Sequence, residues 1–263
     1  MMHRRALFGR REDSMSYEQT IENEQKKGFA LLLPFRSVMF LLVFVIGAAV
    51  VEKKTEEITN WWSVVCSLVN VITILLILVL TRVNKTTYAK LIHFEKGKTG
   101  AKRTVYIVIG IVVLGMSGMY LAGLLCYGKL PYAPASIIAP IPTWMAALNV
   151  LILPVTTALA EDGLYLGCGT GQMKGKAAAI LIPAFFFALQ HCFIPVIFDV
   201  RYMVYRFLSF LPLALVLCWF FHRKKEPLPI LIGHAILDLA TAVSILATSA
   251  VPGVYEKAVE MMG

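Results

Sequence analysis

The amino-acid sequence predicts an all-α membrane protein, a polytopic bundle of about seven transmembrane helices with its N-terminus in the cytoplasm. Hydrophobic residues make up 58% of the chain and charged residues only 16%, whereas soluble domains are roughly half apolar and a quarter charged. The apolar residues stand in long runs, and about 20 such residues cross a bilayer as a helix. Because lipid offers the backbone no hydrogen-bond partners, runs of this length have to be helical.

Seven apolar runs follow a polar segment of mixed charge. Residues 1–28 are expected to form a cytoplasmic tail, and residues 29–263 to form one membrane-embedded helical domain. Within the sixth run, Arg206 and Pro212 are expected to interrupt the helix. The predicted spans are Phe29–Val51, Trp61–Leu80, Thr104–Tyr127, Pro142–Cys168, Ala177–Phe198, Tyr202–Phe221 and Leu228–Ser249.

The distribution of positive charge predicts the orientation. The formal net charge is +9, and the Lys and Arg residues flank the apolar runs. With the N-terminus inside, most of the 25 Lys and Arg residues fall on the cytoplasmic side, as membrane proteins prefer. The basic excess therefore indicates topology and contact with anionic lipid headgroups, and it does not favour nucleic acid as a partner.

A few ionisable side chains lie within the apolar runs. Each costs roughly 2.5–3.5 kcal/mol to insert at the centre of a membrane helix, so these residues are candidates for function. Most of them lie in the second half of the chain. They are Arg36, Glu161, Asp162, His191, His234 and Asp238.

Glu161 and Asp162 are adjacent carboxylic acids near the end of the fourth run. An acidic cap at the membrane interface is one interpretation of this pair. The C-terminus of a helix disfavours negative charge, however, so the helix end gives no reason to place two acids there. A functional carboxylate pair is the alternative that we prefer.

Two histidines lie at helical spacing from a second residue. Phe187 and His191 are four residues apart and so share a helix face, as do His234 and Asp238. An aspartate one turn from a histidine can accept its ring N–H and fix its tautomer. Packed core residues remain the alternative interpretation of both pairs.

Taken in order, these three elements resemble the CAAX-protease and bacteriocin-processing family of intramembrane endopeptidases. That family carries EExxxR, FxxxH and HxxxN/D motifs on successive membrane helices. The corresponding segments here are 161–166, 187–191 and 234–238, and the resemblance extends over roughly residues 140–245. The chain departs from the pattern at Leu166, where the family has arginine, and at Asp162, where the family usually has glutamate.

The resemblance implies a role for each site residue. Glu161 would be the general base that takes a proton from water, and His191 would orient that water. His234 and Asp238 would stabilise the oxyanion, with Asp238 either protonated or orienting His234. Asp162 and Phe187 would support these groups.

The resemblance implies a mechanism that needs no metal cofactor. The alternative is that Glu161, His191, His234 and Asp238 bind a divalent metal such as zinc, because two histidines and one or two carboxylates suit it. Counted at 1.5 Å per residue, His191 would lie roughly 22 Å from the cytoplasmic side and His234 roughly 13 Å, although a shared substrate requires similar depths.

We therefore expect an intramembrane peptidase of the cell membrane of a bacterium, acting on a membrane-associated peptide or protein. Two alternatives remain open. Leu166 favours a catalytically inactive relative that serves as a membrane scaffold or immunity protein. The buried acids and histidines would also suit a proton-coupled transporter.

Overall fold

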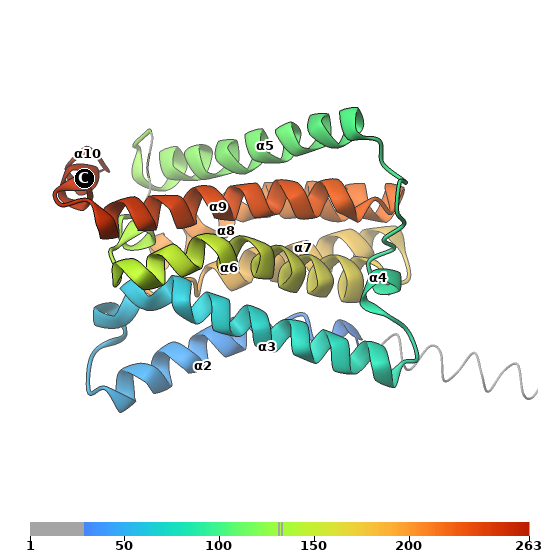
Figure 1. Ribbon diagram of the computed structural model, residues 1–263, viewed down its shortest axis with the longest axis horizontal. Helices are drawn as coiled ribbons and strands as arrows, with labels where there is room; N and C mark the ends of the chain where they lie inside the picture. Colours follow the sequence, from blue (N-terminus) through green and yellow to red (C-terminus); the bar gives the residue numbers. More distant parts are fainter. Residues whose placement is uncertain (1–28, 131, 133, 263) are drawn as a thin grey trace, which may run out of the picture.

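The computed structural model describes residues 29–130, 132 and 134–262. Over these residues the chain forms a helical bundle and contains no β-strand, which confirms the predicted all-α fold (Figure 1). The predicted cytoplasmic tail, residues 1–28, lies outside the described residues.

The elements follow the predicted runs closely. Within the described residues, five helical segments are long and apolar enough to cross a membrane, and α2 and α7 are shorter apolar helices. The protein is therefore an integral membrane protein, while seven spans and a cytoplasmic N-terminus remain predictions. The elements are α2 (Phe35–Val50), η1 (Thr55–Trp61), α3 (Trp62–Val83), α4 (Tyr88–Leu91), α5 (Ala101–Tyr127), η2 (Ala135–Ile138), α6 (Thr143–Glu161), η3 (Asp162–Thr170), α7 (Lys176–His191), α8 (Val200–Lys224), α9 (Pro227–Ala250) and α10 (Val254–Met262).

The sixth predicted span is one continuous helix, so the expected interruption is wrong. Asp199 caps α8 by accepting a hydrogen bond from the backbone N–H of Tyr202 at 2.6 Å. The helix then continues through Arg206 and Pro212. Arg206 is buried within the bundle, and proline is tolerated in membrane helices where neighbouring groups satisfy the freed backbone.

The fifth helix ends earlier than predicted. α7 stops at His191, although the apolar run continues to Phe198. Pro195 lies in the following segment; it has no N–H to donate and disfavours helical geometry at Ile194. His191 is therefore placed at a helix end, beside an irregular segment that leads into α8.

The helices that carry the predicted motifs pack together in the middle of the bundle. In Figure 1, α6, α7, α8 and α9 lie between α5 on one side and α2 with α3 on the other. α6 packs along α9 and α7 along α8, while α5 contacts both α8 and α9. Close approach depends on small residues: a Cβ atom added at Gly118 of α5 would lie 2.5 Å from the Ser209 carbonyl oxygen of α8.

Candidate active site

The two adjacent acids lie where α6 changes into a π-helix. Glu161 is the last residue of α6, and η3 continues from Asp162 with π-helical geometry. Its wider turn is evident in the hydrogen bond from the Gly171 N–H to the Leu166 carbonyl, at 2.7 Å. π-Helices are rare and often occur at functional sites. Both acids are buried, with exposed fractions of 1% for Glu161 and 2% for Asp162.

Tyr88 of α4 packs against η3 at Gly163. A Cβ atom added at Gly163 would lie 2.8 Å from Tyr88 Cε2 and 3.1 Å from Ile77 Cδ1. The Tyr88 hydroxyl donates a hydrogen bond to the Leu159 carbonyl at 2.6 Å. Burial and then the charge of Asp162 raise the pKa of Tyr88, so its hydroxyl stays a donor. This contact fixes the turn that carries the two acids.

Replacing Gly163 with alanine is expected to destabilise the protein by about 1–3 kcal/mol, because the added methyl group overpacks this contact. The measurement is thermal unfolding of the purified protein in detergent. Gly110→Ala in α5 is the matched control, since its added Cβ has no neighbour within 4 Å. If Gly163→Ala unfolded at the same temperature as Gly110→Ala, the proposed packing of α4 on η3 would be wrong.

Glu161 forms a buried ion pair with a residue from the first predicted span. Arg36, in the first turn of α2, donates from Nη2 to Glu161 Oε1 at 2.8 Å. The exposed fractions of the two side chains are 0% and 1%. A buried carboxylate needs such a partner, because an unpaired charge in low dielectric is strongly destabilising. The pair also connects α2 to the motif-bearing helices.

The guanidinium of Arg36 is held on its other sides as well. Its Nε donates to Gln190 Oε1 at 2.6 Å and its Nη1 to Thr73 Oγ1 at 3.2 Å. Gln190 Oε1 also accepts a hydrogen bond from the Tyr165 hydroxyl at 3.1 Å. Arg36 thus bridges α2, α3, α6 and α7 with a planar fork of donors that lysine cannot supply.

The Arg36–Glu161 ion pair supplies a guanidinium to the site, although Leu166 stands where the family's motif has arginine. Leu166 is buried in the hydrophobic core of the bundle, and Arg36 brings a guanidinium to the carboxylate from elsewhere in the chain. In the sequence, Arg36 stands out as a costly charge within a span. No signal in the sequence joins Arg36 to Glu161.

His234 of α9 lies among three carboxyl groups. Its Nδ1 is 3.1 Å from Asp162 Oδ1, and its Nε2 is 3.5 Å from Glu161 Oε2 and 3.6 Å from Asp238 Oδ2. Asp162 is therefore the hydrogen-bond acceptor that orients the ring. The expectation that Asp238 accepts this ring N–H is wrong, since 3.6 Å is too long for a hydrogen bond.

His191 has a defined tautomer. Its Nδ1 is 2.8 Å from the Phe187 carbonyl oxygen. A carbonyl can only accept, so Nδ1 carries the hydrogen and the neutral ring keeps a lone pair on Nε2. Phe210 stacks on the ring with centroids 3.5 Å apart. Phe187 contacts both histidine rings, with centroid distances of 5.1 Å to His191 and 5.8 Å to His234.

These side chains meet at one cavity of about 90 Å³. Glu161, His191, His234 and Asp238 all line it, together with Phe187. The expected difference in depth between His191 and the other groups is therefore not found. The depths were counted from the lysines that flank α7 and α9. Because these are separate helices, their flanking lysines need not lie at the same level, so the two counts cannot be compared directly.

Three carboxylate oxygens of the acids around His234 lack the hydrogen bond that buried oxygens normally have. Glu161 Oε2, Asp162 Oδ2 and Asp238 Oδ2 are buried and have no hydrogen-bond partner within the described part of the chain. Buried polar atoms are normally paired, so a cluster of exceptions calls for an explanation, such as a role in binding or catalysis. Glu161 Oε2, which lies 3.5 Å from His234 Nε2, belongs to the carboxylate whose other oxygen Arg36 holds.

A metal centre is not preformed by these side chains. Among the residues that the structure describes, no three His, Cys, Asp or Glu side chains are arranged to hold a metal ion. Glu161 Oε1 is occupied by Arg36, and Nδ1 of His234 is directed at Asp162. A metal-independent mechanism remains a prediction, and a chelator provides its test.

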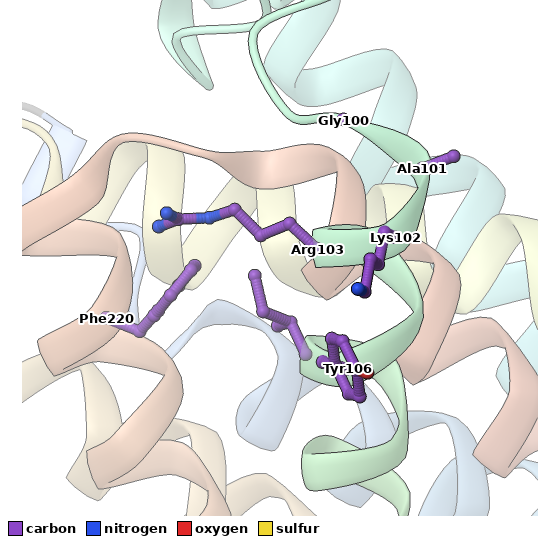
Figure 2. A pocket seen from close by; sticks show the side chains of 7 residues that line it. Gly100, Ala101, Lys102, Arg103, Tyr106 and Phe220 are labelled. Carbon is purple, nitrogen blue, oxygen red and sulfur yellow. The ribbon is translucent and has the colours of Figure 1, made fainter.

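A larger open groove lies elsewhere on the bundle (Figure 2). It has a volume of about 680 Å³ and is formed by the start of α5 and by Phe220 of α8. None of the predicted site residues lines it. Met119, which does line the small cavity, lies about 18 Å further along α5 than Ile107, the last α5 residue of the groove, at 1.5 Å per residue.

The fold and the site together define an integral membrane helical protein with a buried cluster of acids, imidazoles and a guanidinium. Residues 143–240 match the family model described as Type II CAAX prenyl endopeptidase Rce1-like. The resemblance expected from the three motifs is thus confirmed, and the matched family is one of proteases. No curated protein and no solved structure gives a match. All six predicted site residues lie within the matched region, whereas Arg36 lies outside it.

Proposed function

We propose that this protein is an intramembrane endopeptidase in which Glu161 activates water to hydrolyse a peptide bond. One observation carries the proposal. Arg36 holds one oxygen of Glu161. The other oxygen has no hydrogen-bond partner in the described part of the chain, and it lies 3.5 Å from His234 Nε2 beside the cavity that both histidines line. A carboxylate held in this way can accept a proton from a water molecule without losing its position.

His191 would position the attacking water. Its Nε2 is a hydrogen-bond acceptor, because Nδ1 donates to the Phe187 carbonyl. One hydrogen of a water molecule could be accepted by His191 Nε2 and the other by Glu161 Oε2. Glu161 would take its hydrogen as a proton, while the water oxygen forms a bond to the peptide carbonyl carbon.

His234 would stabilise the oxyanion that this attack creates. Nδ1 faces the acceptor Asp162, so only a doubly protonated ring has an N–H left on Nε2 to donate. Carboxyl oxygens of Asp162, Glu161 and Asp238 lie 3.1–3.6 Å from the two ring nitrogens, so the ring can be held from both sides. Glu161 would then pass its proton to the leaving amine as the C–N bond breaks.

The inactive-relative alternative depended on Leu166, and the pairing of Arg36 with Glu161 weakens it. The transporter alternative has no feature in its favour beyond the buried acids and histidines.

We also propose that the substrate is a membrane-associated peptide and that the host membrane is bacterial.

The proposal is tested by reconstituting the purified protein in lipid vesicles with a library of membrane peptides and analysing the products by mass spectrometry. We expect cleavage that continues in the presence of a chelator. Loss of cleavage on chelation would replace the metal-independent mechanism with a metal-dependent one. No cleavage of any peptide would favour the scaffold, and proton-driven uptake into the vesicles would favour the transporter.

A further inference from the structure

A second cavity adjoins the candidate active site. It has a volume of about 260 Å³, and residues of α5, α8, α9 and η2 form its walls. Asp238 and Phe210 line both this cavity and the small one that Glu161 lines. At about 30 Å³ per water molecule, the volume holds about nine water-sized groups, which is room for one long side chain. A peptide bound at Glu161 could therefore place a neighbouring side chain in this second cavity.

Most of the wall of the second cavity is apolar. Met116 and Met119 of α5, Leu213 of α8 and Leu237 of α9 all contribute to it. Methionine is flexible and polarisable, so it adapts to the shape of a bound group. These walls suit the hydrocarbon part of a side chain.

Asp238 is the single charged residue that lines the second cavity. Its Oδ2 lies 3.6 Å from His234 Nε2, and neither of its carboxyl oxygens has a hydrogen-bond partner among the residues that the structure describes. The two buried arginines do not supply its counter-ion. Arg36 is paired with Glu161 at 2.8 Å, and Arg206 donates to backbone carbonyls. The side chain of Asp238 is 26% exposed, so the carboxylate remains accessible to a ligand.

The hydroxyl groups of the second cavity have no hydrogen left to donate. Each gives its hydrogen to the carbonyl four residues earlier on its own helix, and only oxygen lone pairs remain for a ligand. The three are Ser209 at 2.8 Å, Ser244 at 2.9 Å and Thr241 at 3.4 Å. The side chains of this cavity thus offer acceptors and one carboxylate, but no donor. A matching ligand is a cation that carries its own N–H groups.

We infer that the second cavity binds a basic side chain, of lysine or arginine, on the residue next to the scissile bond. This inference rests on the proposed peptidase function. The alkyl stem contacts Met116, Met119 and Leu237, and the cationic end pairs with Asp238. Hydrogen bonds between charged groups are among the strongest that a protein forms, and more so where water is scarce. An acidic side chain at the same position is repelled by Asp238.

The test varies the best peptide from the vesicle assay. The residue on each side of the cleaved bond is replaced in turn by lysine, arginine, norleucine and glutamate; norleucine has an alkyl stem like that of lysine but no charge. On one side of the bond, we expect the basic residues to exceed norleucine by about 10- to 100-fold in kcat/KM, and glutamate to be cleaved most slowly. Equal rates at both positions, or a preference for glutamate, would overturn the inference while the peptidase proposal stood. No cleavage of any peptide would overturn both.

A variant shows whether Asp238 causes the preference. The family's motif also has asparagine at this position, so Asp238→Asn should fold. Its ratio of lysine to norleucine cleavage should fall to about one. The ratio is taken within one variant, so it does not depend on the overall rate. Glu95→Gln, which removes a negative charge at the surface, is the control and should keep the wild-type ratio. An unchanged preference in Asp238→Asn would contradict the assignment.

A binding measurement covers the case in which Asp238→Asn cleaves nothing. The Glu161→Gln variant, which should bind without rapid cleavage, is titrated with the lysine peptide and with the norleucine peptide. We expect the lysine peptide to bind at least about tenfold more tightly, and the added Asp238→Asn substitution to remove this difference. Equal affinities in Glu161→Gln, or a difference that survives the second substitution, would show that Asp238 does not bind a basic side chain.

Discussion

Replacing Glu161 with glutamine is expected to lower the rate of peptide cleavage by about 10²- to 10⁴-fold, the range that a positioned general base contributes. Glutamine has nearly the same size as glutamate and can still accept a hydrogen bond from Arg36. It cannot take a proton from water, so the loss should appear in kcat with little change in folding. The measurement is the initial rate of cleavage of the best peptide from the vesicle assay.

Glu95→Gln is the matched control for this substitution. The side chain of Glu95 is 67% exposed and pairs with Lys98 at the surface, so the variant should cleave at the wild-type rate. If Glu161→Gln kept more than about a tenth of the wild-type rate, a base catalyst at this position would be ruled out.

Replacing Arg36 with methionine is expected to reduce cleavage by about 100-fold or more, even though this residue lies outside the region that matches the protease family. Methionine fills similar space but leaves the Glu161 carboxylate buried and without its partner, a change that typically costs about 3–5 kcal/mol in stability. A carboxylate that has lost its guanidinium would change its position or its charge, and it would serve poorly as a base. Initial rates and unfolding temperatures are measured on the same preparations.

Two further variants show which property of Arg36 the cleavage rate depends on. Arg36→Lys keeps the charge, but one ammonium group cannot reach Gln190, Thr73 and Glu161 with the geometry of a planar guanidinium, so we expect an intermediate rate. Arg82→Met removes an exposed cation near the end of α3 and should leave the rate unchanged. Wild-type activity in Arg36→Met would mean that the ion pair plays no part in catalysis.

The fold could be predicted well from the sequence because hydrophobic runs of membrane length leave the backbone few alternatives. The runs predicted for the second, third and seventh spans match α3, α5 and α9 within a few residues at each end. The errors arose where local sequence and tertiary surroundings disagree. Arg206 and Pro212 looked like interruptions, but a buried environment accepts them within α8. The apolar run from Ala177 to Phe198 looked continuous, but Pro195 limits the helix.

The candidate site was predicted in composition but not in its connections. The three motifs named the groups that line the cavity, because ionisable residues within apolar runs are few. The partner of Glu161 lies 125 residues away, and no local pattern links two single residues over that distance. The spacing of His234 and Asp238 suggested that they pair, whereas the π-helical turn after Glu161 places Asp162 at the ring instead.

The coupling free energy between Arg36 and Glu161 tests the central claim most directly, because it requires neither a known substrate nor activity. Unfolding is measured for the wild type, Arg36→Met, Glu161→Gln and the double variant under the same detergent conditions. If the two side chains form a buried ion pair, Arg36→Met should be less stable than the double variant, with a coupling of about 1–3 kcal/mol. Substitution effects that add within about 0.3–0.5 kcal/mol would show that Arg36 does not hold the carboxylate of Glu161.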